Sequence, residues 1–204
     1  MPVDRLPPGR HGLSRDEVSG DQRDRMLHGM AEAAFDSGYA SVTVADVLKR
    51  AGVSRETFYE QFANKEDCFM AAYEAAVAVL MEALGEAIQA VEGGLPDLID
   101  RIFGCYLEVL GDPKLAWTFL IEINAVGPAA VKQRAETQAR GVDAIAAAMG
   151  AANERQRFAC DVLFVMLIGL VTQRVAAGKG DALADLREPL VEVALSILSA
   201  AGLE

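Results

Sequence analysis

The amino-acid sequence predicts an all-α protein made of a small N-terminal three-helix unit and a larger C-terminal helical unit. Hydrophobic residues make up 52% of the 204 residues and charged residues 24%, a balance typical of globular proteins. Alanine, leucine and glutamate, which favour helices, dominate, and strand-like alternation of β-branched residues is scarce. Glycines and prolines divide the apolar periodicity into segments of helical length.

Length and cysteine spacing limit the kinds of protein that this chain can be. A chain of 204 residues suits one or two small domains. Cys68, Cys105 and Cys160 lie 37 and 55 residues apart, which suits neither a metal site nor a redox pair, so we expect reduced, mostly buried thiols. The longest apolar run, residues 162–171, is too short for a bilayer, which needs about 20 residues. Because residues 1–10 have no apolar core, we expect a cytoplasmic protein without a membrane segment.

Residues 1–20 are expected to form a flexible basic arm, because prolines and glycines prevent regular structure there and several arginines lie among them. A first helix is predicted over residues 21–37 and ends at Gly38, which suits a left-handed C-terminal position. The apolar side chains of this helix form one stripe: Met26, Met30, Ala33 and Ala34.

Two further short helices follow around a glycine turn. Thr43 is expected to cap the first of them, with Asp46 in the place of the usual Glu or Gln of a capping box. Gly52 ends this helix, and Ser54 caps the next one, which runs to Phe62. Because only two or three residues join the two helices, this is the sequence form of a helix-turn-helix. The buried side of the first helix is expected to be Val47, Leu48 and Ala51.

A long fourth helix is predicted to begin after Asn64, which caps it, and to extend over more than 25 residues. Its length suffices to link two domains, so we place the boundary between residues 21–66 and residues 67–204. Glycine- and proline-containing breaks then separate the later helices, which are predicted at residues 95–110, 113–124, 129–149, 153–177 and 183–201.

The formal net charge of −11 is concentrated in the C-terminal part of the chain. Up to Lys65 there are nine Lys and Arg residues against ten Asp and Glu, and the remainder has ten against twenty. Salt screens charges that lie farther apart than about 8–10 Å. The overall acidity therefore does not prevent the N-terminal unit from binding phosphate locally.

The third helix presents a surface rich in hydrogen-bond donors. In a helix-turn-helix the second helix enters the DNA major groove. Phe58 and Phe62 lie four residues apart and are expected to face inward, so the opposite face would contact DNA. Arginine can pair with guanine, glutamate can accept from cytosine, and hydroxyl groups reach phosphates or bases. The residues expected at this surface are Arg55, Glu56, Thr57, Tyr59 and, at its end, Gln61.

Lys65 is expected to act as a phosphate clamp at the start of the fourth helix. Its charge and the free backbone N–H groups of the first turn would point the same way. The basic arm is expected to settle along the flanking DNA, since cationic arms can enter a narrow minor groove.

The stretch "TVADVLKRAGVSRETFYEQFANKEDCF", residues 43–69, resembles the DNA-binding segment of the TetR/AcrR family of bacterial transcriptional regulators. The resemblance extends back through the first helix and covers about 50 residues. The matching positions include Ala51-Gly52-Val53-Ser54, Thr57-Phe58-Tyr59 and Asn64-Lys65-Glu66, together with Ala34 and Gly38-Tyr39. Ala45 departs from those members that carry a long base-reading side chain at this position.

The resemblance implies a homodimeric repressor that binds a palindromic operator through two helix-turn-helix domains and is released by a small ligand. It also implies that the last two helices form the dimer interface. By position, Tyr59 and Lys65 would contact phosphate, and Thr43 and Thr57 would lie near the backbone. Arg55, Glu56 and Gln61 take positions at which base readers vary within the family. The complete expected DNA-binding set is Thr43, Ser54, Arg55, Glu56, Thr57, Tyr59, Gln61 and Lys65.

Residues 162–171 are apolar nearly all round the helix, so this helix must be buried on more than one side. It could lie at the centre of a single domain, or it could contact both its own core and a partner chain. The resemblance favours the partner chain. A second candidate face on the last helix is formed by Leu190, Ala194, Ile197, Leu198 and Ala201.

Aromatic and apolar residues of the middle helices are either plain core or the lining of a pocket for a small, largely apolar ligand. Glu122 and Asn124 lie among apolar neighbours, where a buried carboxylate must be paired or partly hydrated. Glu122 could pair with Arg101 or Arg140, or it could orient a ligand with Asn124. The expected ligand-binding set is Phe103, Tyr106, Leu107, Trp117, Leu120, Glu122, Asn124 and Phe164.

Other classes of function have less support in the sequence. An enzyme is not expected, because the only histidines are His11 and His28 and the chain has no Gly-rich phosphate loop or nucleophile elbow. We expect neither a metal nor a cofactor. A constitutive DNA-binding regulator without a ligand stays open, as does a helical adaptor that binds only protein.

Overall fold

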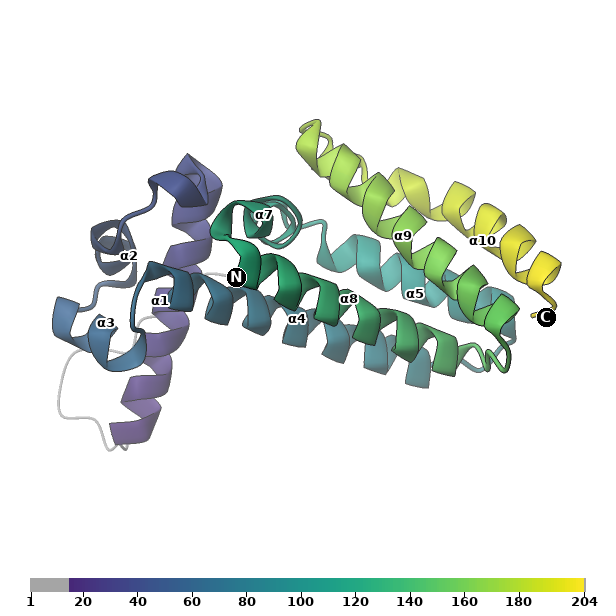
Figure 1. Ribbon diagram of the computed structural model, residues 1–204, viewed down its shortest axis with the longest axis horizontal. Coiled ribbons are helices and arrows are strands. Elements are labelled where there is room, and N and C mark those ends of the chain that lie inside the picture. Colours follow the sequence, from purple (N-terminus) through teal and green to yellow (C-terminus); the bar gives the residue numbers. More distant parts are fainter. Residues whose placement is uncertain (1–14, 204) are drawn as a thin grey trace. The chain divides into compact units, whose positions relative to one another are not determined.

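The computed structural model describes residues 15–203, and it confirms the all-α fold class, since the described residues contain helices and no strand. Residue contacts divide the chain into two compact units, Met1–Glu74 and Ala75–Glu204, which we call the N-terminal and C-terminal units. Figure 1 shows the helices of both. Most of the expected basic arm, residues 1–14, lies outside the described residues.

Three helices and the beginning of a fourth build the N-terminal unit: α1 (Arg15–Ser37), α2 (Val44–Ala51), α3 (Arg55–Gln61) and α4 (Lys65–Gln89). A short 3₁₀ turn, η1 (Tyr39–Ser41), joins α1 to α2. All four helices contribute side chains to one small core, which includes Met26, Met30, Val47, Phe58 and Phe69, each with no exposed surface. The inward sides of these helices are thus apolar.

Helix α1 begins six residues before its predicted start, so residues 15–20 belong to a helix rather than to the arm. The reason is that Gly20, the only breaker in this stretch, costs a helix only about 1 kcal/mol relative to alanine. An added Cβ at Gly20 would meet no atom within 4 Å, so the glycine marks no close packing either.

The predicted helix ends of the helix-turn-helix are confirmed. Thr43 and Asp46 form a reciprocal capping box at α2, and Ser54 accepts a hydrogen bond from the Thr57 backbone at α3. Gly52 ends α2 in the left-handed conformation, with φ 65° and ψ 39°, which glycine adopts without steric cost. At α4, the Asn64 side chain accepts from the Asp67 backbone at 3.0 Å.

The C-terminal unit is a helical bundle whose core draws on every long helix in it. Helix α10 packs against α5 and α9, and α8 packs against α9 (Figure 1). Its core includes Ile99, Phe103, Leu120, Leu163 and Val171. The elements are α5 (Leu95–Val109), α6 (Pro113–Trp117), η2 (Thr118–Glu122), α7 (Ile123–Val126), α8 (Pro128–Ala148), α9 (Glu154–Ala176), η3 (Gly180–Ala182), η4 (Ala184–Leu186) and α10 (Arg187–Ala201).

Two C-terminal helices differ from the prediction. The helix expected at 113–124 is interrupted by η2, which has π-helical hydrogen bonding and continues into α7. The helix expected at 183–201 begins only at Arg187, after the 3₁₀ turns η3 and η4. Pro189 explains this start, because it has no N–H to donate to the carbonyl of Asp185, so an α-helical register cannot extend farther back.

Helices α4 and α9 are long and apolar enough to cross a membrane by length and composition. Core helices of soluble proteins pass the same test, so this is weak evidence for a membrane segment. Much of α9 is buried in the described core, including Leu163, Leu167 and Val171.

The close approach of α1 to α2 at Gly29 gives a stability prediction. A Cβ added at Gly29 would lie 3.2 Å from the Arg50 Cβ and 3.3 Å from the Val47 carbonyl oxygen. We expect Gly29→Ala to lower the free energy of unfolding by about 1–2 kcal/mol, because overpacking outweighs the gain in helix propensity. Gly20→Ala in the same helix should raise it by about 0.5–1 kcal/mol. Urea denaturation of both variants checks this, and a Gly29→Ala variant as stable as Gly20→Ala would contradict it.

Candidate functional site

The outer face of α3 carries the side chains with which the chain could read DNA. Phe58 points into the core, whereas Arg55, Glu56 and Tyr59 are exposed, Tyr59 to 49%. The guanidinium of Arg55 lies 5.9 Å from the centre of the Tyr59 ring, so the two side chains share one side of the helix. This face carries a guanidinium, a carboxylate and a phenol, and the opposite side of the helix is buried in the core through Phe58.

The hydroxyl groups of the helix-turn-helix are engaged in caps. The Thr43 hydroxyl donates to the Asp46 carboxylate at 2.6 Å, and the Ser54 and Thr57 hydroxyls lie 2.9 Å apart in a hydrogen bond. Hydrogen bonds from the Thr43 hydroxyl and backbone hold the pKa of the Asp46 carboxyl below its usual range. All three hydroxyl residues stand at helix starts, where they also remain near the surface.

Gln61 differs from its expected orientation. It is half-buried, and its side-chain amide donates to the Ser19 hydroxyl of α1 at 2.6 Å. The sequence places Gln61 one turn after Thr57 but gives no sign of this partner, because Ser19 lies 42 residues away. In the described structure this amide therefore connects α3 to α1 instead of extending from the exposed face that carries Arg55, Glu56 and Tyr59.

Lys65 is also drawn into the N-terminal unit. Its ammonium donates to the carbonyls of Tyr39 at 3.1 Å, Ala40 at 3.3 Å and Val42 at 2.9 Å. It also lies 4.6 Å from the centre of the Tyr39 ring, which packs edge-on against Phe69. An ammonium has three N–H donors, and here each has a carbonyl within reach. These contacts hold η1 against the start of α4, and the phosphate contact expected of Lys65 stays a prediction.

Arginines that the sequence interpretation missed tie α1 to the helix-turn-helix. Arg25 donates to the Ala51 carbonyl at 2.6 Å, next to the glycine turn, and pairs with Asp21 at 3.0 Å. Arg50 of α2 pairs with Asp36 of α1 at 2.9 Å. The i,i+4 spacing of Asp21 and Arg25 is a sequence signal for the first pair. No local pattern indicates the other two contacts, which cross between helices.

Most of the expected ligand-binding residues lie in the core of the C-terminal unit. Phe103, Tyr106, Leu107 and Leu120 are buried in it, and Trp117 and Phe164 are partly buried against it. The ring of Phe164 lies against Gly141 of α8, where an added Cβ would come within 2.8 Å of the ring. All six side chains belong to one apolar core or pack against it, and their role in ligand binding stays a prediction.

Glu122 and Asn124, the two polar members of this set, differ from each other. Glu122 is buried and accepts a hydrogen bond from the indole Nε1 of Trp117 at 2.8 Å, so neither Arg101 nor Arg140 is needed to explain it. Asn124 is exposed, donates to the carbonyls of Leu120 and Ile121, and accepts from Arg134. The expectation that Asn124 lies among apolar side chains is wrong, since positions two apart on a helix face roughly opposite sides and Glu122 occupies the buried one.

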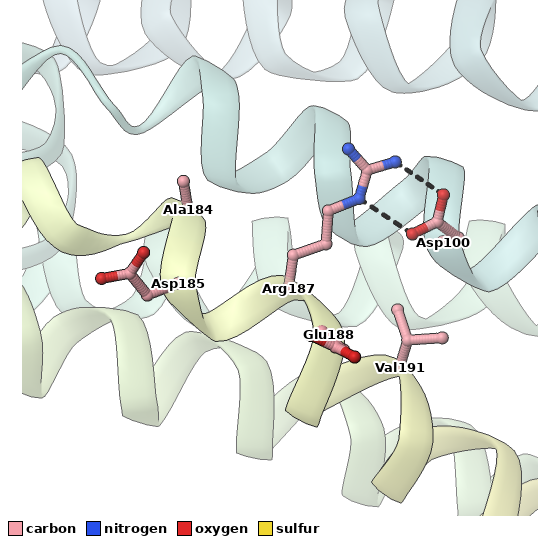
Figure 2. Close-up of a pocket in the computed structure, with 6 residues that line it drawn as sticks. All are labelled: Asp100, Ala184, Asp185, Arg187, Glu188 and Val191. Atoms are coloured by element: carbon pink, nitrogen blue, oxygen red, sulfur yellow. Dashed lines mark hydrogen bonds and ion pairs between the residues drawn. The ribbon is translucent and has the colours of Figure 1, made fainter.

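A pocket of about 560 Å³ lies elsewhere in the C-terminal unit, between α5 and the start of α10 (Figure 2). Arg187 reaches across to Asp100 with two hydrogen bonds, of 2.8 and 2.6 Å, which hold the pKa of the Asp100 carboxyl below its usual range. Its guanidinium lies where a side chain on Gly104 would clash. None of the expected ligand-binding residues lines this pocket; its lining is Asp100, Ala184, Asp185, Arg187, Glu188 and Val191.

The three cysteines are free thiols, as predicted. Cys68 and Cys160 are buried and Cys105 is half-buried. Burial raises the pKa of the Cys68 thiol to about 12, so the reactive thiolate is strongly disfavoured. We therefore assign the thiols to packing rather than to chemistry.

Comparison with known proteins gives a family match over the residues that form the helix-turn-helix. Residues 27–72 match the family model described as bacterial regulatory proteins, tetR family. The chain is 29% identical to the HTH-type transcriptional regulator EthR from Mycolicibacterium smegmatis over 138 residues, covering 66% of this chain and 54% of EthR. The chain spans about half the length of the curated relatives that it matches.

Solved structures share the fold over most of the chain. The fatty acid degradation regulator FadR from Bacillus halodurans has a TM-score of 0.75 and 18% identity, with 85% of this chain and 94% of that chain covered. FadR from Bacillus subtilis, solved in complex with stearoyl-CoA, has a TM-score of 0.64 and 17% identity, with coverages of 87% and 96%. At these sequence identities, the similarity shows a shared fold and nothing more.

The three carbonyl contacts of Lys65 predict a structural effect of its replacement. Lys65→Met should lower the free energy of unfolding by about 1–2 kcal/mol, because the η1 carbonyls lose a charged donor. Lys49→Met, which removes an exposed lysine from α2, is the matched control and should change stability by less than about 0.5 kcal/mol. Chemical denaturation measures both. Equal stabilities of the two variants would show that the Lys65 contacts are not needed for folding.

Proposed function

Because this chain belongs to the TetR family of bacterial regulatory proteins, we propose that it is a cytoplasmic, homodimeric transcriptional repressor that binds a palindromic operator. The observation that carries this proposal is the face of α3, where Arg55, Glu56 and Tyr59 extend from a fully capped helix-turn-helix. In this geometry the second helix of the motif enters the major groove. Thr43, Ser54 and Thr57 stand at helix starts from which backbone N–H groups can reach phosphates.

We propose that the N-terminal unit binds DNA and that the C-terminal unit holds the dimer interface and the response to a ligand. The interface is supported by large apolar side chains that lie exposed on α9 and α10. Phe158 and Val165 are 67% and 69% exposed and lie seven residues apart, which places them on one side of α9. Val193 of α10 is 45% exposed. A second copy would cover these side chains, and such a patch also explains the apolar character of α9.

A small, largely apolar ligand would release the protein from DNA. The chain passes from the N-terminal unit to the C-terminal unit within α4, so a ligand that displaces α4 would change the distance between the two copies of α3. The ligand must prefer the released form, and a tenfold effect on DNA affinity needs about 1.4 kcal/mol of preference. The stearoyl-CoA complex of the FadR neighbour supports a long acyl chain as the first ligand class to test.

A constitutive DNA-binding regulator is the second candidate. It is favoured by the packing of the expected pocket, since four of the eight expected ligand-binding residues are buried in the core of the C-terminal unit and two more pack against it. A ligand could enter only if this core opened. Footprints that resist every tested ligand would favour this candidate.

DNase footprinting on the DNA upstream of the protein's own gene tests the proposal directly. We expect one protected region with two-fold symmetry, because a symmetric dimer presents two copies of α3. Arg55→Ala should weaken binding to the best site by about 1–3 kcal/mol and relax the preference at one position of each half-site. Absence of any protected region, with DNA fragments from neighbouring genes included, would argue for the protein-binding adaptor instead.

The dimer interface is tested by placing a charge on it. Val165→Glu should weaken dimerisation more than about 100-fold, since an unpaired carboxylate would be buried between two copies of α9. Val131→Glu on α8, where valine is 50% exposed, should leave the dimer intact. Sedimentation equilibrium of the two variants gives the result. A Val165→Glu variant that remains dimeric at wild-type concentrations would place the interface elsewhere.

Trp117 is the only tryptophan and gives a direct signal for ligand binding. We expect stearoyl-CoA, or another effector of this class, to change its fluorescence at the concentrations that abolish DNA binding. Glu122→Gln keeps an acceptor for the indole and should weaken the ligand by about tenfold if the carboxylate orients it. Asn124→Ala, on the exposed side of the same segment, is the control. Unchanged ligand affinity in both Trp117→Phe and Glu122→Gln would place the pocket elsewhere.

A further inference from the structure

The direction in which α3 points determines which bases it can read. Phe58 has no exposed surface and marks the inward side of the helix. Glu56 lies two residues before Phe58 and Glu60 two residues after it. Around the helix axis, each therefore points about 160° away from the direction of Phe58. Both are exposed. The two carboxylates therefore stand one turn apart on the outermost line of α3, and Arg55 and Tyr59 lie beside them.

Adenine is matched best by a side-chain amide, which donates and accepts side by side, and α3 offers no amide on this face. Adenine is read in the major groove by the amide of Asn or Gln, which pairs with N6 and N7. The only such side chain in α3 is Gln61, whose amide donates to the Ser19 hydroxyl at 2.6 Å and is half-buried. The Thr57 hydroxyl is likewise engaged with that of Ser54. The hydrogen-bonding groups that remain are one guanidinium and two carboxylates, together with the Tyr59 phenol.

These groups suit G·C pairs. A guanidinium pairs with O6 and N7 of guanine, and a carboxylate accepts from the N4 amino group of cytosine. A carboxylate is repelled by the N7 acceptor that adenine carries beside its amino group, whereas cytosine has no such acceptor. We propose that α3 reads G·C pairs, with Arg55 on guanine and with Glu56 and Glu60 as specificity-determining residues that accept from cytosine. This inference rests on the proposed function of DNA binding.

The carboxylates have a second consequence, for affinity. The exposed face of α3 carries two negative charges and one positive charge, so it gains nothing from the phosphate backbone as a whole. Where no cytosine amino group meets them, Glu56 and Glu60 repel the DNA. Their presence should therefore lower binding to unrelated sequences and sharpen the discrimination between sites.

Selection from a random double-stranded DNA library tests this with the full-length protein. Wild type should enrich half-sites with G·C pairs at the positions that α3 contacts. Glu56→Gln should shift one of these positions from cytosine towards adenine by on the order of 10-fold, and Glu60→Gln should do the same at a nearby position. Both variants should also bind a scrambled site more tightly than wild type. Glu82→Gln, an exposed glutamate on α4, is the matched control and should change neither property.

The outcomes separate this inference from the proposal on which it rests. Enriched half-sites with A·T pairs at the contacted positions would overturn the G·C preference while leaving DNA binding intact. So would unchanged base preferences in both glutamate variants. Gln61→Ala should keep the wild-type preference, and a change at any position would overturn the exclusion of Gln61 from reading. Failure of the wild type to enrich any sequence would overturn both the proposed function and this inference.

Discussion

The helix-turn-helix of this chain depends on the hydrogen bonds that satisfy the ends of two very short helices. Helices α2 and α3 have eight and seven residues, whereas isolated helices shorter than about 12–15 residues are marginal in water. Caps at Thr43 and Ser54 satisfy the N-terminal donors. Arg25 reaches the last carbonyl of α2, and Lys65 reaches three carbonyls in and beside η1. Charged side chains thus complete the frame that presents α3.

The helix ends of this frame could be predicted from the sequence, and its cross-links could not. A cap joins residues two or three apart, and a left-handed glycine acts on its own backbone, so a short stretch of sequence contains the whole interaction. The contacts of Lys65 and Gln61 join residues 23 to 42 positions apart. The residue types show that these side chains can donate hydrogen bonds. Which acceptors lie within reach depends on the folded structure.

The same distinction holds in the C-terminal unit. Glycine and proline breaks predicted the positions of most of its helices, and many of its apolar residues lie in the core. The π-helical turn η2 has no such sign in the sequence. A π-helical turn brings residues five apart onto one side, which is the separation of Trp117 and Glu122, and their 2.8 Å hydrogen bond uses that alignment. Local hydropathy, which is apolar around both residues, does not indicate that Glu122 is buried and Asn124 exposed.

An acidic reading face also gives dimerisation a specific importance. If α3 contacts DNA through the face that carries two carboxylates and one guanidinium group, this face gains little from phosphate attraction. Two copies joined through α9 and α10 would bind the second half-site at a high effective concentration, which multiplies affinity without any new contact. That gain is lost when the distance between the two copies no longer matches the operator. A protein built in this way would be released by a modest displacement of α4, because most of its affinity comes from simultaneous binding rather than from charge.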